Sequence, residues 1–457
     1  MTASSDTSAT IPPDGRQLRR VVFSGLLGTA IEYYDFLIYA ALTALVFNKV
    51  FFPNSNPGLA TIAAFGTFAA GYVARPVGGI IFGHFGDRLG RKSMLVVSMS
   101  IMGVASFLIG VLPTYATAGI AAPILLVVLR FLQGLAIGGE WGGATLMITE
   151  YSEPERRGFW NGLMQMGSPI GGLLSTITLT ILTATLSDEA LLSWGWRIPF
   201  LLSLLLLAAG LYVRLGVAES PLFQQAMRAE VTGRTELERI PLMQILRKPR
   251  NLLLACAVGL GPFALTALLS TYMLSYATAI GYKRADVVQG LLYLAITSLV
   301  MIPVASAITD RLGRRTVIMA AAIGIIVFAW PLYALVGMLS VPALILAMVV
   351  GQTLQSAMYA PLGALLSEMF GTSVRYTGAS MGYQLAALVG AGFTPLLAAA
   401  LHANSVSSTP LVAMAIGCGV ITAGAICLIG ETRGKDLSSS DAPAAPAIGM
   451  ANPDPVR

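Results

Sequence analysis

Long apolar stretches recur along this chain, and their length restricts the folds it can adopt. Twelve of them run for about 20 to 25 residues, the length at which a helix crosses the hydrocarbon core of a bilayer. Charged or turn-forming residues separate them. The sequence therefore predicts an all-α membrane protein with twelve transmembrane helices, at approximately 21–47, 59–82, 93–112, 120–149, 159–186, 197–214, 252–279, 287–308, 316–338, 342–368, 376–402 and 409–430.

The composition agrees with a core that is built in lipid. The 457 residues are 56% hydrophobic and only 11% charged, whereas soluble domains are about one-quarter charged. Cys256, Cys418 and Cys427 lie in apolar stretches without paired spacing, so we expect neither a disulfide framework nor a metal site. The net charge of +6 is explained by loop arginines, and we expect no nucleic acid partner.

Lys and Arg gather on one side of the predicted spans. The N-terminus, the even-to-odd loops and the tail hold 22 of the 28 basic residues, which predicts that both termini are cytoplasmic. We expect a cytoplasmic segment at 1–20, six-helix bundles at 21–214 and 251–430, a cytoplasmic central loop at 215–250 and a disordered cytoplasmic tail at 431–457.

The two bundles carry matching strings. DRLGR begins at Asp87 and again at Asp310, 223 residues later; a glutamate followed by an arginine seven residues on recurs at a separation of 218 residues. Two matches at nearly equal separations indicate two pseudo-symmetric halves that descend from one six-helix unit. Transporters with such halves rock them around a central site.

The string FGHFGDRLGRK at 82–92 predicts a contact between helices at the cytoplasmic face. Gly83, Gly86 and Gly90 would permit tight turns, and Asp87 would accept hydrogen bonds from a helix N-terminus or pair with arginine. The alternative is a loop that only supplies positive charge, but the copy at Asp310 favours a gate. The predicted gate residues are Asp87, Arg88, Arg91, Lys92, Glu150, Arg157, Asp310, Arg311, Arg314, Glu368 and Arg375.

These strings resemble those of a known family. GHFGDRLGRK is similar to the signature loop of the major facilitator superfamily. Other strings resemble its metabolite:proton symporter family, which includes shikimate, α-ketoglutarate, citrate and proline/betaine permeases. They are IEYYDFLIYA at 31–40, RFLQGLAIGGEWGGA at 130–144, SWGWRIPF at 193–200, ESPLF at 219–223 and VRYTGASMGYQ at 374–384.

Charged residues inside predicted spans are costly in lipid and therefore indicate function. Glu32 and Asp35 share one face of the first span with Tyr39, and Arg130 lies at a comparable depth in the fourth. A carboxylate beside arginine can act as a proton switch or as a static pair that fixes helix packing. The resemblance implies that Asp35 and Arg130 couple transport to the proton, with Glu32 as a second carboxylate.

Further polar residues inside the spans are candidates for substrate binding. The resemblance implies that Arg75 holds a substrate carboxylate or balances charge; the alternative is a side chain that extends towards the cytoplasmic interface. Glu140 would join proton coupling or pack against the second helix. The amides and hydroxyls would bind substrate or link helices. The predicted substrate site contains Arg75, Arg130, Gln133, Tyr39, Gln165, Tyr383 and Gln384.

Together these features and the resemblance predict a monomeric transporter of the bacterial inner membrane that imports a small polar organic acid with a proton, by alternating access and without a cofactor. The glycines of GSPIGG at 167–172 raise the alternative of a proton-driven exporter of drugs or metabolites, and a receptor or scaffold is a third possibility. An enzyme is not expected, since no phosphate-binding loop or metal-ligand cluster interrupts the spans.

Overall fold

The computed structural model describes residues 15–54, 57–220, 223–224, 241–247, 249–371, 374–402 and 407–435. Within these ranges the regular elements are helices, and eleven helical segments are long and apolar enough to cross a membrane. The helix at Pro57–Leu89 occupies the position of the second predicted span. The predicted all-α membrane fold is thereby confirmed.

The first half begins earlier than the apolar pattern indicates. The first helix starts at Gly15, inside the segment that we expected to precede the membrane, and ends in a π-helical turn at Thr43–Phe47. The helices of this half are α1 (Gly15–Leu42), α2 (Asn48–Val50), α3 (Pro57–Leu89), α4 (Arg91–Val111), α5 (Tyr115–Ala118), α6 (Ala121–Tyr151), α7 (Arg157–Gln165), α8 (Gly167–Thr185), α9 (Asp188–Ser193) and α10 (Ile198–Leu215).

The second half repeats this order after a short helix in the central loop. Two of its spans also contain π-helical turns, at Ala267–Tyr272 and Leu388–Phe393. Its helices are α12 (Pro241–Arg247), α13 (Arg250–Thr266), α14 (Met273–Ile280), α15 (Arg284–Leu312), α16 (Arg314–Gly337), α17 (Val341–Tyr359), α18 (Leu362–Met369), α19 (Arg375–Ala387), α20 (Thr394–His402) and α21 (Thr409–Leu428).

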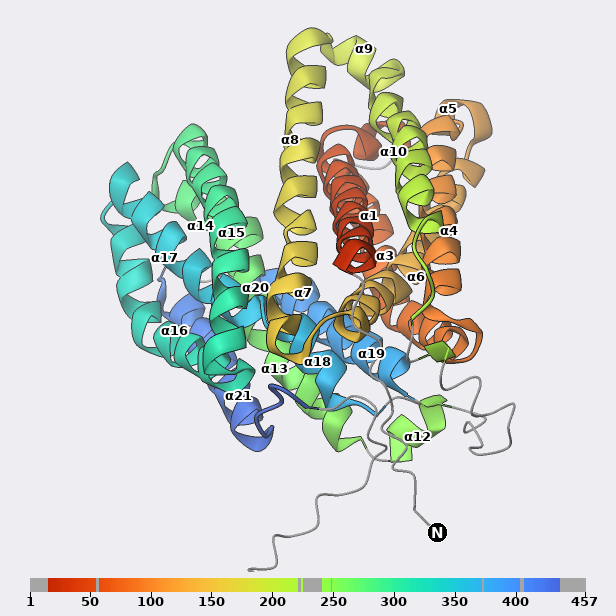
Figure 1. Cartoon of the computed structure of the whole chain (residues 1–457). Coiled ribbons are helices and arrows are strands. Elements are labelled where there is room, and N and C mark those ends of the chain that lie inside the picture. The colour runs from red at the N-terminus through yellow and green to blue at the C-terminus, as the bar shows by residue number, and fades with distance from the viewer. Residues whose placement is uncertain are drawn as a thin grey trace, which may run out of the picture.

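The halves spread apart at one end of the molecule and meet at the other (Figure 1). The end where they meet, which we call the convergent face, contains α7, α13, α18 and α19. One buried apolar cluster joins side chains of both halves there, including Trp141, Met164, Phe263 and Tyr383. The outer clusters around Trp196 and around Tyr333 each belong to a single half.

The glycines in and beside the two DRLGR strings have two different structural roles. Gly90 and Gly313 have φ angles of 103° and 93° and make the corresponding turns into α4 and α16. Gly83 and Gly86 lie inside α3, so the predicted turns at these two positions are wrong. Their missing side chains leave room for Thr377 and the ring of Tyr376 from α19.

Close packing between α3 and α6 also depends on glycine. A Cβ atom at Gly134 would overlap the carbonyl oxygen of Gly71, and one at Gly138 would overlap that of Arg75. The RFLQGLAIGG part of the sequence therefore brings two helix backbones into contact and fixes the positions of Arg75 and Arg130, which project from these helices.

Gly134→Val should destabilise the protein, because the backbone of α3 cannot yield as a flexible side chain would. We expect a loss of about 1–3 kcal/mol, seen as a lower melting temperature in detergent. Gly66→Val is the matched control, since nothing lies within 4 Å of a Cβ atom built there. Equal melting temperatures for the two variants would contradict this account of the α3–α6 contact.

Candidate functional site

Two aspartates join the halves at the convergent face. Asp87 at the end of α3 accepts hydrogen bonds from the backbone N–H groups of Tyr376 and Thr377, each at 3.2 Å, and from the Thr377 hydroxyl at 2.9 Å. These groups form the first turn of α19 in the other half. A carboxylate there satisfies unpaired N–H groups and complements the positive end of the helix dipole.

Asp310 makes the corresponding contact from the second half to the first. Its carboxylate accepts hydrogen bonds from the N–H groups of Gly158 at 2.9 Å and Phe159 at 2.7 Å, in the first turn of α7. Each half therefore supplies one aspartate and one helix N-terminus. Both aspartates are buried, and the contacts hold the convergent face closed.

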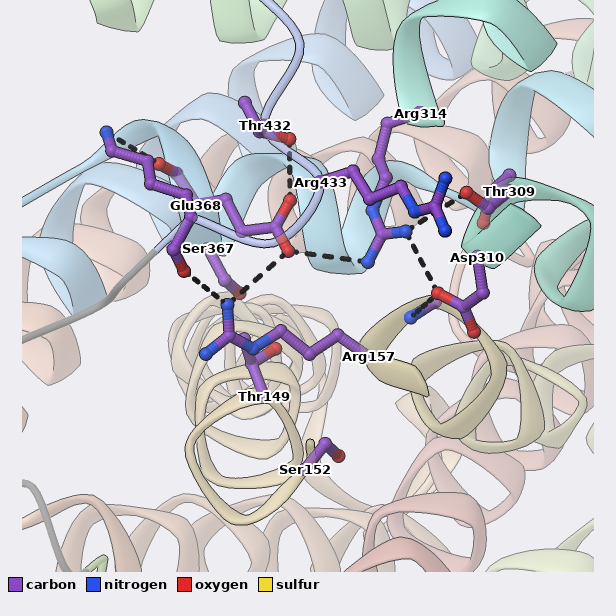
Figure 2. A network of polar contacts seen from close by, with 12 residues as sticks. Thr149, Ser152, Arg157, Thr309, Asp310, Arg314, Ser367, Glu368, Thr432 and Arg433 are labelled. Atoms are coloured by element: carbon purple, nitrogen blue, oxygen red, sulfur yellow. Dashed lines mark hydrogen bonds and ion pairs between the residues drawn. The ribbon is translucent and has the colours of Figure 1, made fainter. Parts of the chain in front are cut away.

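Ion pairs surround Asp310 in the second half (Figure 2). Arg314 lies 2.9 Å from the Asp310 carboxylate and 3.4 Å from that of Glu368. Arg157, from the first half, approaches Glu368 at 3.8 Å, and the Thr432 hydroxyl donates to Glu368 at 2.6 Å. The network therefore links α7, α15, α16 and α18 with the segment after α21.

The first half contains a matching network. Glu150 lies 3.1 Å from Arg91 of the same half and 3.3 Å from Arg375 of the other half, and it accepts a hydrogen bond from the Ser220 hydroxyl. Glu150 and Glu368 thus take equivalent positions, each between one arginine from its own half and one from the partner half. Buried charges are tolerated here because they are paired.

Two further glutamates at the convergent face were not among the predicted gate residues. Glu219 accepts hydrogen bonds from the N–H groups of Arg91 and Lys92 at 3.2 and 3.1 Å, and Glu431 accepts from those of Arg314 and Arg315, each at 3.1 Å. A repeat in the sequence could have indicated them, because Glu-Ser at 219–220 and Glu-Thr at 431–432 each follow the last helix of a half.

The remaining predicted gate residues lie at the edge of this arrangement. The Lys92 ammonium donates to the carbonyl of Leu215 at 3.0 Å. Arg88 and Arg311 are exposed, and within the part of the chain that the structure describes neither side chain forms an ion pair. These two arginines therefore do not hold the halves together in this conformation.

A second charged cluster lies inside the first half. Asp35 accepts hydrogen bonds from the Gln133 amide at 2.6 Å and the Ser203 hydroxyl at 3.1 Å. The same glutamine accepts a hydrogen bond from Arg130 at 3.1 Å, so it bridges the two charges. The Arg130 guanidinium also lies over the ring of Tyr39, at 4.0 Å from its centroid.

The Major Facilitator Superfamily family model matches residues 25–381 and 293–452. The chain belongs to the major facilitator superfamily. It is 40% identical over 427 residues to the inner membrane metabolite transport protein YhjE of Escherichia coli K12, with 92% of this chain and 95% of that protein covered. It is 39% identical to the E. coli K12 shikimate transporter over 84% of this chain and 87% of the relative.

Solved structures agree on the superfamily fold. The proton:xylose symporter XylE bound to 6-bromo-6-deoxy-D-glucose superposes with a TM-score of 0.74 at 16% identity, covering 93% of this chain and 98% of XylE. The inward-open form of XylE from E. coli gives 0.62 at 18% identity, with 92% and 98% covered. The twelve-helix, two-bundle architecture predicted from the sequence is therefore confirmed.

Glu140 forms an ion pair with an arginine that was not among the predicted site residues. Arg214 of α10 lies 2.6 Å from the Glu140 carboxylate, which also accepts a hydrogen bond from the Ser98 hydroxyl at 2.9 Å. The apolar pattern placed Arg214 at the cytoplasmic end of its helix, but it is buried in the bundle. Its partner could not be found without knowing that α4, α6 and α10 are neighbours.

The glutamines predicted to bind substrate contact the opposite half. The Gln165 amide donates to the carbonyl of Ala360 at 2.8 Å, and the Gln384 amide donates to those of Ile137 and Gly138 at 3.3 and 3.4 Å. In this conformation the amide groups contribute hydrogen bonds across the contact between halves.

Aromatic side chains lie beside these hydrogen bonds. Tyr383 stacks on Trp141 of the first half, with ring centroids 3.6 Å apart, and its hydroxyl lies 2.9 Å from that of Tyr359.

The helix-five glycines have a packing role. Cβ atoms at Gly167 and Gly171 would overlap backbone carbonyl oxygens of α1, at Leu26 and Ala30. These glycines therefore set the close contact between α8 and α1, and they give no separate support to an exporter. Within the described ranges, no group of three or more His, Cys, Asp or Glu residues has the arrangement of a metal site.

Asp87→Asn and Asp310→Asn should each loosen the convergent face, because an amide keeps the shape but loses the charge that binds the helix N-terminus. Hydrogen bonds to a charged group contribute about 1.5–3 kcal/mol, so the open population should rise about tenfold or more. Ser306 is buried beside Gly162 and can report this opening after substitution by cysteine.

The measurement is the alkylation rate of Ser306→Cys by a membrane-impermeant maleimide applied to the convergent face, relative to the native Cys427, which is exposed. Each aspartate variant should raise that ratio. Arg311→Gln is the control and should leave it unchanged, since that side chain forms no ion pair in the described structure. Equal ratios in all three variants would show that the aspartates do not hold the halves together.

Proposed function

We propose that the protein is a proton-coupled symporter of the inner membrane that imports a small polar organic acid by alternating access. The observation that carries the proposal is the group of buried charges in the first half, where Glu32 and Asp35 on α1 face the region of Arg75 and Arg130. Such a group can exchange a proton for an anionic substrate without leaving a charge unbalanced in lipid. The similarity to a shikimate transporter supports the substrate class.

We infer that the convergent face lies on the cytoplasmic side of the membrane. Basic residues support this orientation, because the start of α1 and both DRLGR strings lie on the side that the distribution of Lys and Arg makes cytoplasmic. The structure then corresponds to a state that is closed towards the cytoplasm. Release of substrate requires the Asp87 and Asp310 contacts to break together, since both halves take part in each.

The distribution of contacts supports alternating access. Apolar packing between the halves is concentrated near the convergent face, whereas the outer clusters lie within single halves. Each half can therefore move as a unit about a site between them. The two halves are connected by equivalent networks, around Glu150 and around Glu368. Neither network alone therefore keeps the convergent face closed.

Purified protein in proteoliposomes tests the proposal. With an acidic exterior, the vesicles should accumulate a carboxylate from a panel of shikimate, 2-oxoglutarate, benzoate and pyruvate, and a protonophore should abolish accumulation. Betaine serves as the zwitterionic comparison. Arg75→Gln should lower uptake of the transported acid at least tenfold, since it removes a buried cation. Outward movement driven by the opposite gradient alone would favour an exporter, and no gradient-driven movement of any compound would contradict the proposal.

A further inference from the structure

The first two turns of α1 carry three arginines outside the apolar stretch. Arg16, Arg19 and Arg20 are exposed, and their spacing of three and four residues places them on one face of the helix. Leu18 and Val21, on the opposite face, are buried in the apolar cluster that joins the two halves. The arginines therefore project away from the protein core on one side of α1.

These arginines line a groove between the start of α1 and the end of α10, which we call the α1–α10 groove. It has a volume of about 540 Å³, and its other lining residues are Gly15, Phe23 and Val213. In Figure 1, α1 lies between α8 and α10, and it packs against both. Arg214, which follows Val213, is buried and donates a hydrogen bond from Nε to the Ser24 hydroxyl at 3.3 Å. This buried contact holds α10 against α1, so the two walls of the groove have defined positions.

The groove gathers positive charge without a compensating carboxylate among the residues that the structure describes. None of its lining residues is acidic, and the ion pairs of the described chain include neither Arg19 nor Arg20. A guanidinium presents parallel N–H donors that match two oxygens of a phosphate or carboxylate, and it is more weakly hydrated than an ammonium group. Three guanidinium groups on one helix face therefore form a site for an anion.

The depth of the arginines in the membrane indicates which anion is available to them. At a rise of about 1.5 Å per residue, Arg16 lies about 8 Å along the helix from Val21, where the apolar stretch begins. The polar headgroup layer outside the hydrocarbon core is about 5–8 Å thick on each side. Tyr212, which precedes Val213 on α10, is 82% exposed, and tyrosines are enriched at this level of the membrane. The guanidinium groups thus lie at the level of the lipid phosphates.

An exposed apolar surface continues from the arginines towards the hydrocarbon core. Phe23 lies on the same helix face as Arg16 and Arg20, about 4.5 Å deeper than Arg20. Its side chain is 52% exposed. A ligand with both a phosphate and an acyl chain would contact the arginines and this ring together, whereas a free phosphate would contact the arginines alone.

We propose that the α1–α10 groove binds an anionic phospholipid, with the headgroup phosphate on the arginines and an acyl chain on Phe23. Arginines that only oriented α1 in the membrane would need no shared helix face, no groove and no exposed ring below them. Both walls of the groove belong to the first half. Movement of one half relative to the other leaves the site intact, so the lipid should stabilise the first half without favouring the open or the closed state.

Lipid binding by the purified protein tests the proposal. Native mass spectrometry in a neutral detergent gives the Kd of phosphatidylglycerol, which carries one net negative charge, and of phosphatidylethanolamine, whose amine compensates its phosphate. Each arginine near the membrane surface favours the anionic lipid about fivefold, so the wild type should bind phosphatidylglycerol about 100-fold more tightly. In Arg19→Gln/Arg20→Gln this preference should fall about 25-fold.

Arg156→Gln/Arg311→Gln is the matched control, because it removes the same charge from two exposed arginines that do not line the groove. It should keep the preference of the wild type. Arg20→Gln alone should lower the preference about fivefold, which keeps the test available if the double variant does not fold. An unchanged preference in the groove variants, or an equal loss in the control, would overturn the site.

Glycerol 3-phosphate, the soluble headgroup without acyl chains, distinguishes the two sources of phosphate. It should not displace phosphatidylglycerol at equal concentration, since it cannot contact Phe23. Displacement at equal concentration would assign the groove to a soluble phosphate compound and overturn the lipid. Phosphatidylglycerol should also raise the melting temperature of the wild type and leave the alkylation rate of Ser306→Cys unchanged. A change in that rate would overturn the independence of the site from opening of the convergent face.

Discussion

The closed face of this protein depends on two carboxylates that each bind the start of a helix in the opposite half. Asp87 binds the first turn of α19, and Asp310 binds the first turn of α7. Helix N-termini offer unpaired N–H groups at fixed positions, so such a contact is directional and cannot slide. The two glutamate-centred networks, at Glu150 and Glu368, neutralise the arginines that gather around these contacts.

The buried charges of the first half differ in whether the structure provides them with partners. The pair of Glu140 with Arg214 is complete within the first half. Asp35 and Arg130 are joined through Gln133. Glu32 lacks a hydrogen-bond donor in the described structure, and the Arg75 guanidinium lies over aromatic rings. Charges without such partners can respond to a proton and an anion, which a saturated network cannot do.

The fold could be predicted because the two patterns that indicate it can both be recognised along the amino-acid sequence, without knowing which helices are neighbours. The length of apolar runs shows which segments span the membrane, and the repeated DRLGR string shows where the halves correspond. It could not show that Arg214 lies beside Glu140, since that depends on which helices are neighbours. It also could not distinguish Gly90, which makes a turn, from Gly86, which makes room for Tyr376. The bridging position of Gln133 required the same three-dimensional information.

We propose that the convergent face opens when the proton and the substrate bind. Spin labels at Arg88→Cys and Arg311→Cys, in a protein whose native cysteines are replaced by serine, would report the separation of the halves, because both side chains are exposed and directly follow Asp87 and Asp310, which bind the opposite half. Pulsed electron resonance should give a short distance at alkaline pH without substrate, and a second, longer distance should appear when acid pH is combined with the transported carboxylate. A distance distribution that does not change under any of these conditions would contradict the account.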